Sequence, residues 1–139
     1  MRSKKVIVDT NIWISFLITK KFEELDELII QHKIVFIFSK ELIEEFLSVV
    51  SRPKFQRYFS NKNIQRLLLL FDEYGQLSDV QSNLSICRDK KDDFLLNLAV
   101  DSQADYLVSG DADLLVLVKI GKTKICKWSD FITSIRSGK

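Results

Sequence analysis

Short apolar runs alternate along this chain with segments whose apolar side chains recur at helical spacing. The runs at 5–8, 34–38 and 105–108 are rich in β-branched and other apolar residues, which is typical of strands buried in a parallel sheet. Helical spacing is clearest over 61–74, where Ile64, Leu67, Leu68 and Phe71 would share one face. Strands that alternate with helices predict an α/β sandwich around a mainly parallel sheet.

Turn and capping residues mark the boundaries of several further elements. Gly75 is the predicted end of helix 61–74, and Ser129 the predicted N-cap of a last helix over 130–135. A weak alternation over 77–86 predicts a short strand within that segment, and 124–126 predicts the last strand. Residues 89–92 resemble a capping box with an acid at each end, which places a helix at 93–102.

Length and composition indicate one folded domain over residues 1–139. The chain is 46% hydrophobic and 29% charged, which is ordinary for a globular protein and argues against disorder. Its 21 Lys and Arg residues and 19 Asp and Glu residues give a net charge of 21 − 19 = +2. This near balance excludes a protein that binds nucleic acid through bulk positive charge alone.

The chain also lacks the residues for several common catalytic and metal sites. His32 is the only histidine, and the two cysteines, Cys87 and Cys126, have no metal-ligand spacing. Zinc sites and Ser-His-Asp or Cys-His catalysis are therefore not expected. Two isolated cysteines in a chain with an adequate core are typical of a reduced, cytoplasmic protein. The sequence predicts neither a signal peptide nor a membrane span.

Acidic residues stand where the predicted strands end. Asp9 follows the first strand, Asp111 follows the strand at 105–108, and Asp113 lies two residues further on. If these two strands are neighbours, Asp9 and Asp111 converge at the carboxyl edge of the sheet, where sites form in open parallel sheets. Further acids come in pairs within helices, at 44–45 and 92–93.

Clustered carboxylates repel one another and raise each other's pKa unless a cation neutralises them. Oxygen ligands without Cys or His favour Mg²⁺ or Mn²⁺, which serve phosphodiester hydrolysis in nucleases. Each acid also has an ordinary structural explanation: Asp9 as an N-cap, Asp111 as the start of a turn, and Asp92 and Asp93 as first-turn acids. The joint occurrence of the acids at one sheet edge favours the functional interpretation.

At these residues the sequence resembles a PIN-domain protein. The likeness covers nearly the whole chain in order, and it lies in four segments: Val8-Asp9-Thr10-Asn11-Ile12, Glu45-Phe46 with Arg52-Pro53-Lys54-Phe55, Asp92-Asp93-Phe94-Leu95, and residues 104–115 around Ser109-Gly110-Asp111-Ala112-Asp113. The second and fourth segments resemble in particular the VapC-like toxins of toxin–antitoxin pairs.

This resemblance implies a three-layer α/β/α fold and a metal-dependent endoribonuclease. It places the catalytic acids at Asp9, Glu45, Asp92 and Asp111, with Asp93 competing with Asp92 for the third place. Metal ligation would involve Asp9, Asp92, Asp93, Asp111 and Asp113. Asn11 would be a supporting polar group, and Ser109 would lie beside the fourth acid. Lys90 and Lys91 depart from the pattern of this branch and leave the local metal geometry open.

Substrate and partner surfaces are expected around this acidic crevice. Lys54, Arg57, Lys90 and Lys91 are candidates for RNA phosphate contacts, and their alternative is ordinary solvated surface charge. Trp13 or Phe55 would stack on bases if exposed, although core packing is favoured for Trp13. Apolar faces at 22–30 and 55–59 are candidates for a homodimer or an antitoxin contact, or else part of the core.

Two other functions remain open from the sequence. A haloacid-dehalogenase-like phosphatase would use Asp9 as its nucleophile, but Asn11 stands where that family has a second Asp. A catalytically inactive PIN domain that binds RNA or protein is the other alternative, and the retained acids argue against it.

Overall fold

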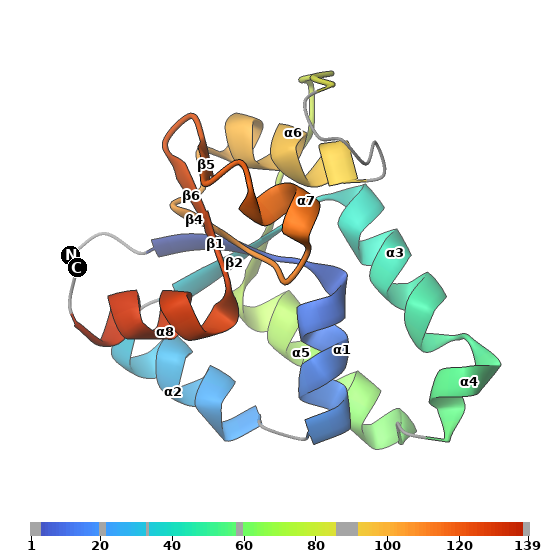
Figure 1. The fold of residues 1–139 in the computed structure, drawn as a ribbon. Helices are drawn as coiled ribbons and strands as arrows, with labels where there is room; N and C mark the ends of the chain where they lie inside the picture. Colours follow the sequence, from blue (N-terminus) through green and yellow to red (C-terminus); the bar gives the residue numbers. More distant parts are fainter. Residues whose placement is uncertain (1–3, 20–21, 33, 58–59, 86–91, 138–139) are drawn as a thin grey trace.

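The computed structural model describes residues 4–19, 22–32, 34–57, 60–85 and 92–137, and these form a six-stranded sheet with helices on both faces (Figure 1). The strand order is β3-β2-β1-β4-β6-β5, and every neighbouring pair is parallel except β5 and β6. The strands are β1 Lys4–Val8, β2 Ile34–Phe38, β3 Gly75–Leu77, β4 Tyr106–Val108, β5 Lys119–Ile120 and β6 Thr123–Cys126. The predicted α/β class and mainly parallel sheet are confirmed.

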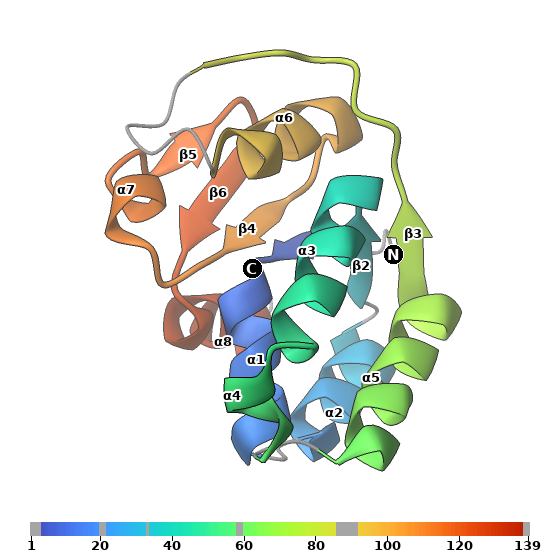
Figure 2. The same cartoon turned by 90° about the vertical axis from the view of Figure 1, so that its right-hand side faces the viewer.

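The helices cover the sheet in two outer layers. They are α1 Thr10–Thr19, α2 Phe22–His32, α3 Lys40–Val50, α4 Pro53–Gln56, α5 Asn61–Tyr74, α6 Asp93–Ser102, α7 Ala112–Leu115 and α8 Trp128–Arg136. Figures 1 and 2 show α2, α5 and α8 on one face of the sheet, and α6 and α7 on the other. The result is the expected three-layer α/β/α arrangement. None of the helices in the described ranges is long and apolar enough to cross a membrane.

An aromatic cluster joins α1 to the sheet and to α5. The Trp13 ring is 1% exposed and makes edge contacts with Phe36 at 5.0 Å and Phe71 at 4.7 Å between ring centroids. Phe38 packs against the Phe71 ring at 4.5 Å. Such buried aromatic pairs add directional packing to hydrophobic burial. Trp13 is therefore a core residue, as favoured from the sequence, and is not available for stacking on bases.

Gly75 ends α5 as predicted, but the next strand begins there rather than within 77–86. β3 pairs in parallel with β2, with Gly75 opposite Phe36. Further along, the amides of Gln81 and Ser82 donate to the Asp101 carboxylate instead of to a strand. The strand prediction was therefore wrong for residues 78–85, because a side chain on α6 takes the hydrogen bonds that a sheet would use, and residue 86 lies outside the described residues.

One further prediction needs correction, and the structure decides one alternative that the sequence left open. The N-cap of α8 is Lys127, so the helix begins at Trp128, before the predicted cap Ser129. The apolar face of α2 is core rather than an exposed partner surface, since Phe22, Leu25 and Leu28 are almost fully buried. Of the other predicted partner segment, Phe55 is half-buried and 58–59 lie outside the described residues.

Candidate active site

The candidate site forms where β1 and β4 end side by side. Val8 pairs with Val108 in the parallel register, and the Asp9 amide donates to the Val108 carbonyl over 2.9 Å. The predicted adjacency of these two strands is confirmed. It sets Asp9 and Ser109, the residues that directly follow the two strands, next to one another at the carboxyl edge of the sheet.

Ser109 connects the acids of the two strand ends. Its side chain is fully buried, and its hydroxyl donates a hydrogen bond to Oδ2 of Asp9 over 2.8 Å. The same oxygen accepts a hydrogen bond from the Asp111 amide over 3.0 Å. One hydroxyl thus fixes the Asp9 carboxyl group and the backbone at Asp111 relative to each other.

Asp111 combines a structural contact with a contact to another acid. As the N-cap of α7, its carboxylate accepts the Asp113 amide over 2.9 Å. A hydrogen bond with the Asp92 side chain, followed by this amide contact, lowers the pKa of Asp111. The structural and functional explanations for Asp111 are therefore compatible, and Asp92 is the member of the 92–93 pair that reaches Asp111.

Glu45 enters the site from α3. Its Oε2 accepts a hydrogen bond from the Thr10 hydroxyl over 2.7 Å, which joins the start of α1 to the middle of α3. The neighbouring Glu44 is exposed and lies 4.0 Å from the Lys40 ammonium group on the same helix. Both glutamates are exposed, but their partners distinguish them: Glu45 contacts Thr10 and lies near Asp9, whereas Glu44 pairs with Lys40.

The Asp9 carboxyl group is the electrostatic centre of this arrangement. It is 8% exposed, and its pKa is raised above the ordinary value of 3.8, mainly by desolvation. The hydrogen bond from Ser109 opposes this shift, whereas repulsion from Glu45 and Asp111 adds to it. The protein therefore holds negative charge in a position where a nearby cation would be strongly favoured.

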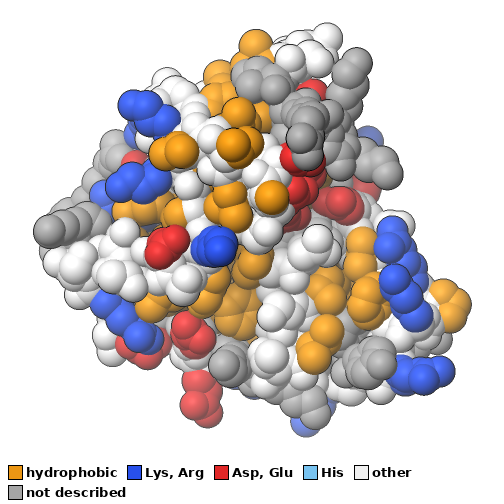
Figure 3. Space-filling model, in the orientation of Figure 1, with side chains coloured by type: hydrophobic (Ala, Val, Ile, Leu, Met, Phe, Trp, Pro, Cys, Tyr) orange, Lys and Arg blue, Asp and Glu red, His pale blue; other side chains and the backbone are white. Residues whose placement is uncertain are grey.

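The acidic side chains are visible on one face of the molecule. Figure 3 shows Asp and Glu side chains gathered where α3, α6 and α7 meet in the view of Figure 1. Lys and Arg side chains lie apart from this group on the same face. The near-neutral total charge thus hides a local concentration of acid.

A sequence model of the PIN domain matches residues 5–113, which include the carboxyl ends of β1 and β4 and the start of α6. The chain belongs to the PIN domain family. A relative from Methanocaldococcus jannaschii, the uncharacterized protein MJ1680, is 33% identical over 116 residues, or 81% of this chain and 74% of the relative. PIN domains are generally metal-dependent nucleases that act on RNA, and they often pair with antitoxins.

The carboxyl groups of this PIN domain suit a divalent cation that keeps part of its water shell. Within the described ranges, no three His, Cys, Asp or Glu side chains are gathered closely enough to chelate a metal directly. The acids instead interact as pairs, with Asp9 near Glu45 and Asp111, and Asp111 bonded to Asp92. Mg²⁺ typically takes one or two carboxylates and retains several waters, so this all-oxygen set fits Mg²⁺ or Mn²⁺.

The other predicted residues lie at different distances from this centre. Asp93 and Asp113 are half-buried in the first turns of α6 and α7, and Asn11 is exposed in the first turn of α1. Asp92 is the N-cap of α6 without a side-chain cap bond. It was predicted as the second acid of a capping box over 89–92, whose other members lie outside the described residues.

The two predicted basic contacts that the structure describes, Lys54 and Arg57, do not lie around the acids. Lys54 and Arg57 are exposed on and just after α4, which lies beyond the end of α3 that points away from the sheet (Figures 1 and 2). Lys54 sits over the Phe55 ring, 5.0 Å from its centroid. Lys90 and Lys91 lie outside the described residues.

Sequence reasoning missed Thr10 as a positioning residue of this PIN domain. Thr10 is 2% exposed, and its hydroxyl is committed to Glu45, which is 35 residues away in the sequence. The available signal was a hydroxyl residue between a strand-end acid and a predicted helix. Its partner depends on how α3 packs against α1.

Proposed function

We propose that this PIN domain is a metal-dependent endoribonuclease that hydrolyses phosphodiester bonds of single-stranded RNA. The observation that carries the proposal is the position of Asp9, which is 8% exposed at the end of β1 and joined through Ser109 to the backbone of Asp111. Its pKa is raised mainly by desolvation, and Glu45 and Asp111 add repulsion. A buried carboxyl group with two acids beside it destabilises the protein unless it serves to bind a cation. Membership of the PIN family supports a nuclease role for that cation, because PIN domains are generally metal-dependent nucleases.

In this proposal the acids divide into principal and supporting groups. Asp9 and Asp111 hold the principal Mg²⁺ or Mn²⁺ ion, and Glu45 and Asp92 complete the crevice directly or through water. Asp93 and Asp113 are outer acids, and Asn11 is a supporting polar group. When bound, the ion supplies charge neutralisation and an activated water for in-line attack on the phosphorus.

The chain's own hydrogen bonds prepare this site. Ser109 keeps an oxygen of Asp9 fixed and, by donating to it, favours the ionised form. Thr10 fixes one oxygen of Glu45 and leaves the other for a water or a cation. Lys54, Arg57, Lys90 and Lys91 are proposed to contact phosphates of the RNA away from the scissile bond.

The decisive experiment is cleavage of an end-labelled single-stranded RNA with Mg²⁺ or Mn²⁺, and with EDTA as the blank. Asp9→Asn and Asp111→Asn should each lower the rate by at least about 100-fold. Glu45→Gln should also lower it, whereas the matched control Glu44→Gln should cleave like the wild type. Undiminished metal-dependent cleavage by Asp9→Asn would refute the proposal.

Metal binding can be measured without cleavage. Mg²⁺ or Mn²⁺ should raise the melting temperature of the wild type by mass action, and Asp9→Asn should lose this effect. The inactive-domain alternative predicts RNA binding without a metal-dependent shift. The phosphatase alternative has no support in the family assignment, and trapping a phospho-aspartate at Asp9 would revive it.

We further propose that the nuclease is the toxin of a toxin–antitoxin pair. PIN nucleases often have antitoxin partners, and the second and fourth motif segments resemble VapC-like toxins. Induction of the protein in a bacterial host should arrest growth, and Asp9→Asn should not. Co-expression of the neighbouring small reading frame should relieve the arrest, and light scattering of the purified chain would establish whether a homodimer forms.

A further inference from the structure

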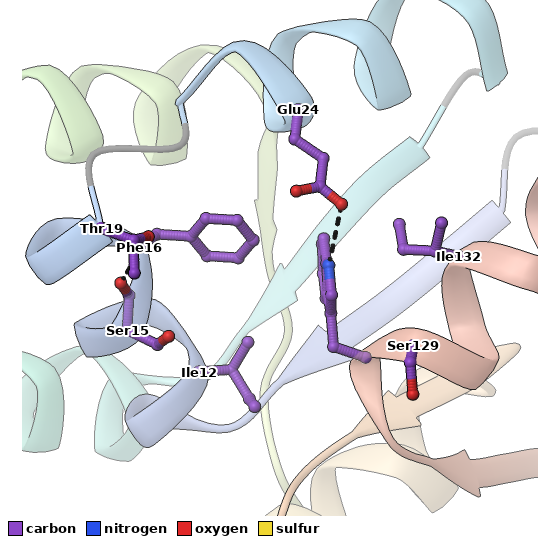
Figure 4. Close-up of a pocket in the computed structure, with 8 residues that line it drawn as sticks. Ile12, Ser15, Phe16, Thr19, Glu24, Ser129 and Ile132 are labelled. Carbon is purple, nitrogen blue, oxygen red and sulfur yellow. Dashed lines mark hydrogen bonds between the residues drawn. The ribbon is translucent and has the colours of Figure 1, made fainter.

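A concave site lies between α1, α2 and α8. It has a volume of about 400 Å³, which is within the range of small-molecule pockets. Figure 4 shows side chains from all three helices around it. The pocket is lined by Ile12, Ser15, Phe16, Thr19, Glu24, Trp128, Ser129 and Ile132. None of these residues belongs to the proposed catalytic set.

Backbone connections place the pocket at the same edge of the sheet as the acids. The Ile12 amide donates to the Asp9 carbonyl over 3.0 Å, so the α1 wall begins in the turn that follows Asp9. On the other side, the Ser109 amide donates to the Cys126 carbonyl over 3.0 Å, and Trp128 follows two residues later. Figure 3 shows the hydrophobic hollow between α1 and α8 on the same face as the acidic group.

The aromatic wall of the pocket is held rigidly. Trp128 is half-buried, and its ring meets the Phe16 ring edge-on with 4.8 Å between centroids. Its Nε1 donates to Oε1 of Glu24 over 3.1 Å (Figure 4). The indole therefore has a fixed orientation before any ligand arrives, with part of its surface still open to the pocket. Preorganised aromatic rings are the usual platform for unpaired RNA bases.

The polar groups that line the pocket are better suited to bind a nucleobase than a phosphate. Of the described residues that line it, none is Lys or Arg, and Glu24 carries the one formal charge. Glu24 uses one oxygen for Trp128, and Figure 4 shows its other oxygen turned toward the side of Phe16 and Thr19. A carboxylate oxygen accepts hydrogen bonds but cannot donate them, so it favours an amino group and repels a carbonyl or phosphate oxygen.

We propose that this pocket binds one unpaired base of the RNA substrate, next to the scissile phosphate, and prefers bases that carry an exocyclic amino group. The inference rests on the proposed function for the identity of the substrate. The base packs against Trp128, and its amino group donates to Glu24. Ser15 and Ser129, both exposed on the rim, are placed for the ribose or the edge of the base.

Cytosine and uracil provide the sharpest comparison, because they differ mainly in an amino group against a carbonyl. Binding of CMP and UMP is measured by quenching of tryptophan fluorescence in the Asp9→Asn background without metal. Trp13, the other tryptophan, is 1% exposed and cannot contact a nucleotide. We expect saturable quenching, with CMP binding about three- to tenfold more tightly than UMP, as one added hydrogen bond allows.

Three variants locate the binding site. Trp128→Phe should abolish the saturable quenching and leave only the absorbance of the nucleotide. Ser15→Phe, a bulky change at an exposed rim position, should block binding while the melting temperature stays unchanged. Glu24→Gln should remove or reverse the preference for CMP, because the amide oxygen accepts from Trp128 and the NH2 group that then faces the pocket donates to a carbonyl rather than accepting from an amino group.

The outcomes separate this inference from the proposed nuclease activity, because quenching requires neither metal nor cleavage. Absence of saturable quenching, quenching that survives Ser15→Phe, or equal affinities for CMP and UMP would each overturn the base pocket, even in a protein that cleaves RNA. Saturable, amino-selective quenching in a protein without cleavage would support the pocket and reject the nuclease proposal alone.

Discussion

The Ser109 hydroxyl donates to the Asp9 carboxylate over 2.8 Å, and this bond joins the ends of two adjacent parallel strands. The hydroxyl is fully buried and also accepts the Asp111 amide, so both of its hydrogen-bonding directions are used. Because burial and two neighbouring acids disfavour charge on Asp9, this bond is the main contact that opposes them.

Replacement of Ser109 by alanine should therefore change the pH dependence of cleavage. Loss of the hydrogen bond raises the pKa of Asp9 further, so the acidic limb of the rate profile moves to higher pH. The variant should also lose about 1–3 kcal/mol of stability, since the Asp111 amide loses its partner. The measurements are a pH–rate profile and urea unfolding.

Ser60→Ala is the matched control for this change. Ser60 caps α5 by accepting the Asn63 amide over 3.2 Å, and it is not one of the proposed site residues. Ser60→Ala should lower the free energy of unfolding by about 0.5–2 kcal/mol and leave the acidic limb of the pH–rate profile unchanged. A shifted limb in Ser60→Ala, or an unshifted one in Ser109→Ala, would contradict the assigned role of Ser109.

Asp9→Asn should stabilise the metal-free protein while it removes activity. The pKa of Asp9 is raised in the folded state above its ordinary value of 3.8, so the native state binds more protons than the unfolded state above that pH. Wild-type stability then falls as the pH rises from 3.8 through the folded pKa, and the asparagine variant escapes this loss. Melting curves in EDTA should show a variant that melts higher, by a margin that grows over this pH window.

Added Mg²⁺ should reverse that order, because only the wild type gains stability from the ion. A variant that melts lower than the wild type in EDTA would mean that Asp9 is chiefly a structural cap.

Thr10→Val tests whether Glu45 requires its hydrogen bond. Valine matches threonine in shape, so the 2%-exposed site stays filled while the bond to Glu45 is lost. Cleavage should fall by about tenfold, the loss expected when one net hydrogen bond orients a catalytic group. Thr10→Ser keeps a hydroxyl and should retain most activity. Combining Thr10→Val with Glu45→Gln should add little further loss, since the two residues act through one contact.

The sequence predicted those parts of the site that depend on local pattern. A strand that ends at an acid and continues into a helix can be predicted from a few residues. The sequence therefore predicted the parallel sheet and the positions of Asp9 and Asp111 at the ends of adjacent strands. The choices between Glu44 and Glu45, and between Asp92 and Asp93, depend on helix packing. Contacts with Thr10 and Asp111 favour Glu45 and Asp92, and neither contact has a local signature.

The missed elements have a similar cause. β3 and β5 are three and two residues long, which is too short to show an alternation of apolar and polar residues. Each forms by pairing with the edge of a neighbouring strand. The pocket between α1, α2 and α8 includes Glu24 and Trp128, which are hydrogen-bonded although they lie 104 residues apart in the sequence. Such pairs follow from tertiary packing, which a single sequence does not display.

Asp101→Asn should loosen the segment that follows β3. The Asp101 carboxylate accepts the amides of Gln81 and Ser82 and the Ser82 hydroxyl, and these bonds lower its pKa. The variant should speed hydrogen exchange of both amides several-fold without affecting the core strands. A lowered pKa gives stabilisation that is present above pH 3.8 and is lost as the pH falls through the folded pKa of Asp101. The exchange rates of the wild type and the variant should therefore become equal in acid. Faster exchange throughout the sheet would contradict a local role.

Gly75→Ala should destabilise the junction between α5 and β3. A Cβ atom at Gly75 would collide with the Phe71 carbonyl oxygen and lie 2.9 Å from the Phe38 ring, so backbone and core must both move. We expect a loss of about 1–3 kcal/mol in urea unfolding, as for overpacked cores. Gly110→Ala is the matched control, because a Cβ there meets nothing within 4 Å and stability should change by less than about 0.5 kcal/mol. Equal stabilities of the two variants would show that α5 shifts freely against β2, and that the close approach at Gly75 does not fix the position of the edge strand.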